Sequence, residues 1–109
     1  MAQFQFEAGG NGLPMNDTSE ALTARNLIEV RIHSEAALTT SENITLTLVS
    51  HRGVDYNQLL INQDLATLTD YRVTKPDIEA AIEPGDRLQW QYTNTDAQPV
   101  TAIAILEGV

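Results

Sequence analysis

The strongest constraint on the fold is an alternation of apolar and polar residues near the C-terminal end of the chain. Between residues 87 and 93, Leu88, Trp90 and Tyr92 alternate with polar side chains. Successive side chains of a β-strand point to opposite faces of a sheet, so this repeat predicts a strand with one buried and one exposed face. The turn sequence Pro84-Gly85-Asp86 comes just before it. We therefore expect a strand that begins after this turn.

The same alternation recurs along the chain, separated by turn-forming residues. We expect strands at 26–34, 44–50, 56–62, 70–74, 88–94 and 100–106, and either a strand or one helical turn at 77–82. Many short strands at regular spacing are typical of sandwiches and barrels. The turns lack the Asn-Gly and Asp-Gly pairs of two-residue hairpins, which favours longer connections. We therefore predict an all-β protein, a single-domain antiparallel β-sandwich that is jelly-roll-like or Greek-key.

One expected strand differs from the others in its pattern. Leu59, Leu60 and Ile61 follow one another without a polar residue between them. A continuous apolar run in a strand indicates burial on both faces. We therefore expect these three side chains to be buried.

The first 24 residues differ in composition from the rest. Residues 8–14 are rich in Gly and Asn, which do not favour a regular element. Phe4 and Phe6 alternate with glutamines before this stretch, a pattern that fits a short strand. We expect residues 1–24 to form an N-terminal arm or extended leader, and residues 25–109 to form the sandwich domain. The phenylalanines of such an arm need an apolar surface on their own domain or on a neighbouring subunit.

Composition argues against several classes of protein. The 109 residues suit one domain, and the chain has no cysteine for disulfides or thiolate metal sites. The formal charge is -9, with six basic residues scattered among fifteen acidic ones. Binding to nucleic acid or to an anionic membrane needs a basic surface, so neither is expected. There is also no run of about 18 apolar residues for a transmembrane helix, and the N-terminus lacks the features of a secretory signal.

The sequence shows no recognisable catalytic or metal-binding motif. His33 and His51 lack the spacing of zinc ligands, and we interpret both as surface residues. There is no Gly-x-Ser-x-Gly elbow and no phosphate-binding loop. Asn94-Thr95-Asp96 offers two oxygen donors, which suits a stabilised turn better than a calcium site. We therefore expect a non-enzymatic protein with no catalytic residues, no cofactor and no metal.

Trp90 and Tyr92 admit two interpretations. They share a face with Leu88, so they can pack in the core of the sandwich. Alternatively, they can form an exposed platform on which a sugar stacks. The second interpretation predicts a carbohydrate-binding module with an accessible Trp90.

From Leu27 to the C-terminus, the order of features resembles small tailed-phage virion proteins with a β-sandwich or jelly-roll body. The segments that carry this resemblance are LIEVRI (27–32), SENITLTL (41–48), GVDY (53–56), NQDL (62–65), IEPGDRL (82–88) and YTNTD (92–96). The proteins in question are similar in role to capsid decoration or cement proteins. The resemblance covers about three-quarters of the chain and is one of pattern.

The resemblance implies a structural role on the surface of a virus particle assembled in the host cytoplasm. Decoration proteins bind the outer shell in many copies, often as trimers, and carry no catalysis. The implied partners are the major capsid protein and further copies of the chain, with a trimer favoured. For docking we select Phe4, Phe6, Leu13 and Met15 of the expected arm. The alternatives are a carbohydrate-binding or other adhesion module, or a minor neck or tail protein of the virion.

Overall fold

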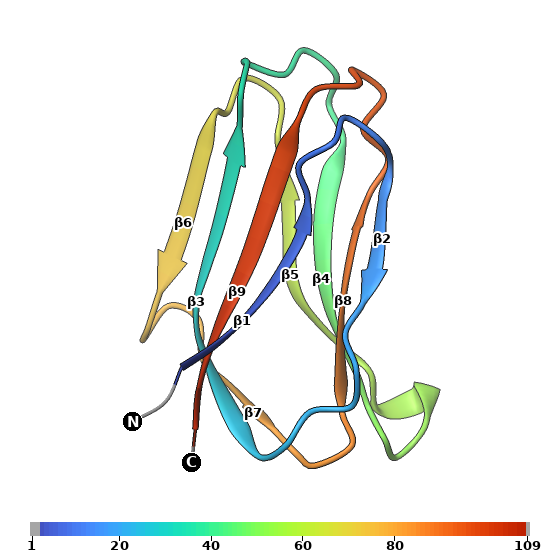
Figure 1. Ribbon diagram of the computed structural model, residues 1–109, viewed down its shortest axis with the longest axis vertical. Helices are drawn as coiled ribbons and strands as arrows, with labels where there is room; N and C mark the ends of the chain where they lie inside the picture. The colour runs from blue at the N-terminus through green and yellow to red at the C-terminus, as the bar shows by residue number, and fades with distance from the viewer. Residues whose placement is uncertain (1–2, 109) are drawn as a thin grey trace.

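The chain folds as two antiparallel β-sheets packed face to face (Figure 1). The computed structural model describes residues 3–108. The strands are β1 (Gln3–Gly9), β2 (Met15–Thr18), β3 (Arg25–Ser34), β4 (Asn43–Val49), β5 (Gln58–Asp64), β6 (Asp70–Thr74), β7 (Ala80–Ile82), β8 (Arg87–Tyr92) and β9 (Val100–Gly108), and one 3-10 turn, η1, spans Val54–Tyr56. The predicted all-β sandwich is confirmed. The segment at 77–82, for which two structures were expected, ends in the strand β7.

The strand order is that of a jelly roll. One sheet, here the β9 sheet, has the order β1-β9-β3-β6, with β7 also paired to β3. The other, the β8 sheet, has the order β2-β8-β4-β5. Strands β1 to β4 therefore pair with β9, β8, β6 and β5, so the first half of the chain pairs with the second half in reverse order. A long antiparallel ribbon rolled into two sheets in this way is a jelly roll.

The core lies between the two sheets and is formed by the alternating apolar side chains of the inner strands. Trp90 has no exposed surface and Tyr92 is 3% exposed. The interpretation of these two residues as core is therefore confirmed. The inner strands contribute Leu27, Val30 and Ile32 from β3, Ile44, Leu46 and Leu48 from β4, Leu88 from β8, and Ala102, Ala104 and Leu106 from β9.

The N-terminal segment differs from the arm that we expected. β1 pairs with β9 at each residue from Gln3 to Gly9, and β2 pairs with β8. The Gly-rich stretch between them is the connection that crosses from one sheet to the other (Figure 1). Gly9 has a φ of 85° and Gly12 a φ of 73°, a left-handed conformation that favours glycine. These glycines therefore shape a sharp crossing, which places β1 in the β9 sheet and β2 in the β8 sheet.

The burial expected for β5 is wrong at one residue. Ile61 is buried and Leu60 is half-buried, but Leu59 is 58% exposed. β5 lies at the edge of the β8 sheet, and its pairing with β4 shifts register between Leu46 and Thr47. The shift places Leu59 opposite Thr47 on the outer face. An apolar run on an edge strand can therefore leave one side chain in solvent.

Among the described residues, no helix is long and apolar enough to cross a membrane.

Replacement of Gly9 tests whether β1 is packed as the structure shows. A Cβ at Gly9 would overlap the carbonyl oxygen of Val100 and approach the terminal methyl group of Met15. Gly53 is the matched control, because its φ of 121° is also unfavourable for alanine but open space surrounds it. We expect Gly9→Ala to lower the free energy of unfolding by about 1–3 kcal/mol more than Gly53→Ala, the usual cost of overpacking. Urea unfolding followed by Trp90 fluorescence measures the difference, and equal losses would contradict the packing of β1.

Candidate functional site

The outer face of the β8 sheet is polar and largely uncharged. The strand registers place its central outward side chains in rows that cross all four strands. Seven of them are amides and hydroxyls, Asn16, Thr18, Thr45, Thr47, Asn62, Gln89 and Gln91, and the eighth is Leu59, opposite Thr47. Two of them are joined across β2 and β8, where Gln89 Nε2 donates to Asn16 Oδ1 at 3.1 Å. We call these seven residues the amide face.

The outer face of the β9 sheet has the opposite character. Glu29 accepts hydrogen bonds from Arg31 on its own strand and from Arg72 on β6. These guanidinium groups lower the pKa of Glu29. His33 Nδ1 lies 2.8 Å from Asp70 Oδ1, and this hydrogen bond raises the pKa of His33. Apart from Arg87 at the start of β8, the charged side chains of the central strands are therefore gathered on this side of the sandwich.

A second surface feature is the loop that joins β4 to β5 (green-yellow, lower right in Figure 1). It projects from one end of the sandwich and contains η1. Val54 is 79% exposed, Tyr56 62% and Leu59 58%. Three of the five large exposed apolar side chains of residues 3–108 therefore lie within six positions. We call Val54 and Tyr56, which lie on the turn itself, the apolar knob; Leu59 follows on β5 and lies opposite Thr47 on the outer face of the sheet.

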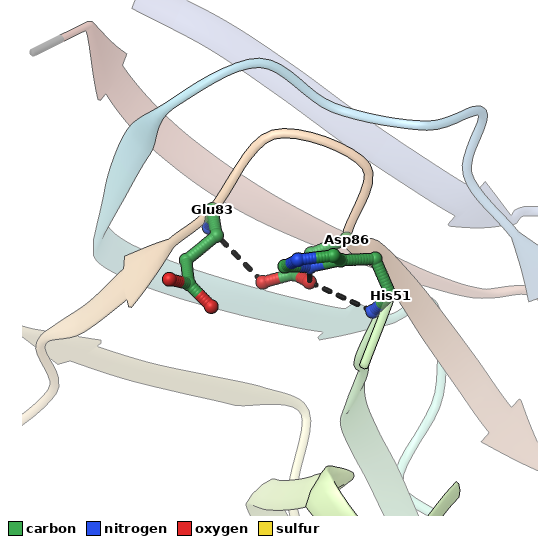
Figure 2. A group of neighbouring side chains, drawn as sticks. All are labelled: His51, Glu83 and Asp86. Atoms are coloured by element: carbon green, nitrogen blue, oxygen red, sulfur yellow. Dashed lines mark hydrogen bonds and ion pairs between the residues drawn. The ribbon is translucent and has the colours of Figure 1, made fainter. Parts of the chain in front are cut away.

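The base of the loop is fixed by the buried carboxylate of Asp86 (Figure 2). Its Oδ1 accepts hydrogen bonds from the backbone N–H of His51 at 2.9 Å and from His51 Nδ1 at 2.7 Å. Its Oδ2 accepts the backbone N–H of Glu83 at 3.0 Å. Burial by itself would raise the pKa of Asp86, but the hydrogen bonds from His51 and Glu83 outweigh it and hold that pKa below its ordinary value. The turn before β8 thus holds the loop after β4.

The same turn also binds the connection between β2 and β3. The N–H of Leu22 donates to the carbonyl oxygen of Asp86, and the N–H of Gly85 donates to the carbonyl oxygen of Leu22, each at 2.8 Å. Gly85 has a φ of 95°, and a Cβ there would lie 3.2 Å from Cβ of His51. Three loops therefore meet around Asp86, and we call this meeting point the Asp86 clamp.

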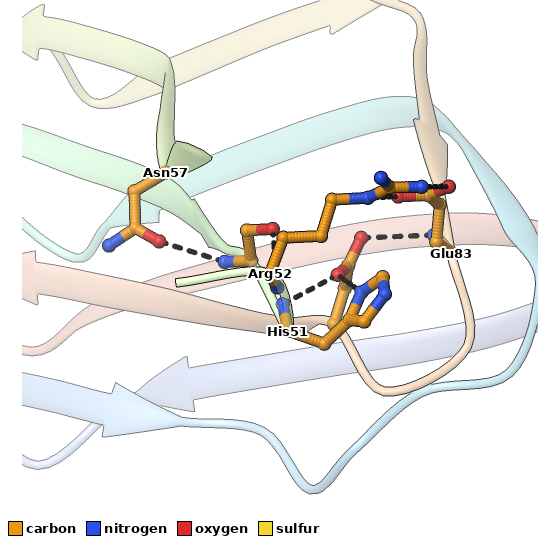
Figure 3. A network of polar contacts seen from close by, with 6 residues as sticks. His51, Arg52, Asn57 and Glu83 are labelled. Atoms are coloured by element: carbon orange, nitrogen blue, oxygen red, sulfur yellow. Dashed lines mark hydrogen bonds and ion pairs between the residues drawn. The ribbon is translucent and has the colours of Figure 1, made fainter. Parts of the chain in front are cut away.

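Two further contacts stiffen the loop that carries the knob (Figure 3). Arg52 makes a two-pronged ion pair with Glu83, with Nε–Oε1 and Nη2–Oε2 distances of 2.9 Å. Asn57 Oδ1 accepts the backbone N–H of Ser50 at 2.8 Å, which joins the two ends of the loop. The knob is therefore presented on a loop whose shape is fixed before any partner arrives, and this lowers the entropy cost of binding.

The clamp residues also have the composition of a metal site. One ligand atom from each of His51, Glu83 and Asp86 lies within 4.8 Å of the other two. These atoms already have partners, because Asp86 accepts three hydrogen bonds and both oxygens of Glu83 face Arg52. A cation would have to displace these bonds. The donor set fits a structural clamp better than a metal centre, and His51 is part of that clamp.

The structure separates the residues selected for docking. Phe4, 37% exposed, and Phe6, half-buried, border one hollow beside the β2–β3 connection. Leu13 is 62% exposed in the β1–β2 connection, where Asn94 Nδ2 donates to its carbonyl oxygen. Met15 is 5% exposed, which removes it from the surface available to a partner. Thus the structure groups only the two phenylalanines.

Sequence reasoning missed the knob and the clamp for different reasons. Val54 and Tyr56 follow Gly53, and apolar residues beside a turn glycine were a signal of exposure that could have been used. The clamp left no comparable signal, because His51 and Asp86 are 35 positions apart. At the opposite end, Asp96 binds Thr39 and Thr40 in the same way, with four hydrogen bonds that lower its pKa to about 2. Residues 94–96 were expected to form a stabilised turn, and Asp96 indeed binds this turn to residues 39 and 40.

No protein-family model matches the chain, and a search of curated proteins found no match.

Substitution of Asp86 tests the clamp. Asp86→Asn keeps the shape of the side chain but turns one acceptor oxygen into a donor that faces an N–H group. We expect a loss of about 2–3 kcal/mol in the free energy of unfolding, the usual cost of a lost hydrogen bond to a buried charge. Asp55→Asn, which removes the same charge from an exposed site in the knob loop, should change it by less than about 0.5 kcal/mol. Urea unfolding at neutral pH measures both.

The effect of the clamp should also depend on pH. Because the pKa of Asp86 is lower in the folded protein, its carboxylate stabilises the fold fully above the unfolded pKa of about 4. This contribution is lost as the pH falls through the lower folded pKa. The advantage of the natural protein over Asp86→Asn should therefore shrink below about pH 4. An advantage unchanged at about pH 2 would contradict a role for the carboxylate charge.

Proposed function

We propose that the protein is a non-enzymatic structural protein of a bacteriophage virion, a capsid decoration protein that binds the outer shell and bridges capsomers. The observation that carries this proposal is the amide face, a broad surface of hydroxyl and amide groups on a chain with a net charge of -9. We propose that this face lies against the major capsid protein, which makes the shell the partner of the β8 sheet.

Desolvation gives the physical reason for selecting this face. A charge buried in an interface must find a partner or lose its hydration, whereas amides and hydroxyls exchange hydrogen bonds with water for hydrogen bonds across the contact. The opposite face, with Glu29, Arg31 and Arg72, would carry a larger desolvation cost. Each contact can be weak, because many copies on one shell and bridges between capsomers add their effects.

The sequence resemblance adds support from the same parts of the structure. Segment 53–56 is the knob turn and segment 82–88 contains the clamp turn. Segments 41–48 and 92–96 meet at the other end of the sandwich, where Glu42 accepts hydrogen bonds from Thr95. The segments on which the resemblance rests therefore include those that fix the loops at both ends of this jelly roll.

The carbohydrate-binding alternative loses the platform on which it was based. It required an accessible Trp90 beside Tyr92, and both side chains are enclosed between the sheets. A minor neck or tail protein would use the same kind of contact surface and differs from a decoration protein in copy number.

A charge placed on the amide face tests this proposal. Thr47→Lys puts an ammonium group at the centre of the face, and Thr74→Lys puts the same group on the outer face of the β9 sheet. We expect the natural protein and Thr74→Lys to sediment with shells of the virus that encodes the chain, and Thr47→Lys to bind about tenfold more weakly, since a buried unpaired charge is costly. Equal binding by both variants would reject the amide face as the contact. No binding by the natural protein would reject the decoration role.

A further inference from the structure

A hollow lies at the end of the sandwich that carries the knob. One wall comes from β4, β5 and the loop between them in one sheet, and the other comes from β7 of the second sheet and the turn that follows it. Its volume is about 410 Å³. This falls within the range of about 300–1,000 Å³ that is usual for small-molecule sites. We call it the Tyr56 hollow.

Tyr56 gives the hollow an aromatic surface. Its side chain is 62% exposed, which makes it the most exposed aromatic residue of residues 3–108. The aliphatic side chains of Leu48 and Ala81 also line the hollow, and Leu48 is buried. The hollow therefore combines an apolar floor with an aromatic ring that is free to contact a ligand.

Polar groups with spare hydrogen-bonding capacity border this apolar surface. Gln58 brings an amide with two donor hydrogens and an acceptor oxygen. Arg52 uses Nε and Nη2 to bind Glu83, and its Nη1 carries two further donor hydrogens. Ser50 Oγ accepts the N–H of Arg52 at 3.0 Å and keeps its own hydrogen for donation. The rim therefore offers both donors and acceptors, which a ligand rich in hydroxyl groups needs.

The charged groups that line the hollow already have partners. Arg52 and Glu83 form the two-pronged ion pair of Figure 3, and this contact lowers the pKa of Glu83. Asp86 is held by His51 and by backbone N–H groups. A free anion would be repelled by the two carboxylates, and a cation would have to displace Arg52 or His51. The hollow is therefore suited to a polar ligand without charge.

The same contacts fix the shape of the hollow before a ligand arrives. The ion pair and the Asp86 clamp each join one wall to the other. Asn57 Oδ1 accepts the N–H of Ser50 and so closes the loop that carries Tyr56. The ordering of a mobile loop would oppose binding, so walls that are already fixed raise the affinity for a small ligand.

We propose that the Tyr56 hollow binds a neutral saccharide. A pyranose ring has an apolar face of C–H groups and a rim of hydroxyls, which matches an aromatic ring bordered by donors and acceptors. Tyr56 packs against the C–H face of the sugar. Gln58 and the Arg52–Glu83 pair bind its adjacent hydroxyls. Tyr56 thus supplies the exposed aromatic surface that the enclosed Trp90 does not. The residues that line the hollow are distinct from those of the amide face, so the inference does not depend on shell binding.

Saturation-transfer difference NMR with maltose, cellobiose, lactose and N,N′-diacetylchitobiose tests the site. We expect at least one of these disaccharides to bind, with the strongest transfer to the protons on one face of a sugar ring. Binding to Tyr56→Ala should be about tenfold weaker in a chemical-shift titration, whereas Tyr56→Phe keeps the ring and should retain most of the affinity. Val54→Ala is the matched control, because Val54 is exposed on the same turn but lies outside the lining of the hollow.

The polar contacts and the preference for a neutral ligand have their own tests. Gln58→Ala should weaken binding by about three- to tenfold, the effect of a lost hydrogen bond. Gln5→Ala, which removes an exposed amide from β1, should leave the affinity unchanged. Glucuronate, which adds a carboxylate to glucose, should bind more weakly than glucose. Trp90 fluorescence reports that each variant is folded.

Three results would overturn the inference. They are an absence of binding by all four disaccharides, an equal loss of binding in Tyr56→Ala and Val54→Ala, and tighter binding of glucuronate than of glucose. Tyr56→Ala should still sediment with shells as the natural protein does, so failure of the saccharide site and failure of the decoration role are told apart.

Discussion

The arrangement of the surface loops depends on one buried carboxylate. Asp86 accepts hydrogen bonds from two segments of the chain and, through its backbone, fixes a third. The strands form because their side chains alternate, but alternation does not determine how the loops at the end of a sandwich lie. A carboxylate in a tight turn can do so, because several N–H groups converge on its two oxygens and together outweigh the cost of its burial. The loop after β4 and the connection between β2 and β3 owe their fixed positions to this residue.

Local pattern predicted the sheets better than it predicted the ends of the chain. Leu88, Trp90 and Tyr92 alternate on a strand with neighbours on both sides, so period two was enough to place them in the core. Phe4 and Phe6 show the same alternation, but the partner of β1 is β9, about 100 positions away. The glycines beside them were expected to belong to an N-terminal arm, whereas they form a crossing between the sheets. Leu59 was misplaced because a strand's position at a sheet edge is set by topology.

The candidate site could be predicted even less, because its parts are far apart in sequence. The amide face combines residues of four strands, and only the strand order shows that they adjoin. Once the jelly roll is known, the distribution of charge on its two outer faces becomes visible and argues for a structural role. We propose that the largely uncharged outer face of the β8 sheet is the surface for contact with a shell.

The most direct test of the decoration role is the copy number of this protein in purified particles of the virus that encodes it. Quantitative peptide mass spectrometry on density-purified particles measures it against the major capsid protein. We expect a number of copies close to that of the major capsid protein, because a bridge between capsomers repeats over the whole shell. A handful of copies would place the protein in the neck or tail, and its absence from the particles would contradict the virion role altogether.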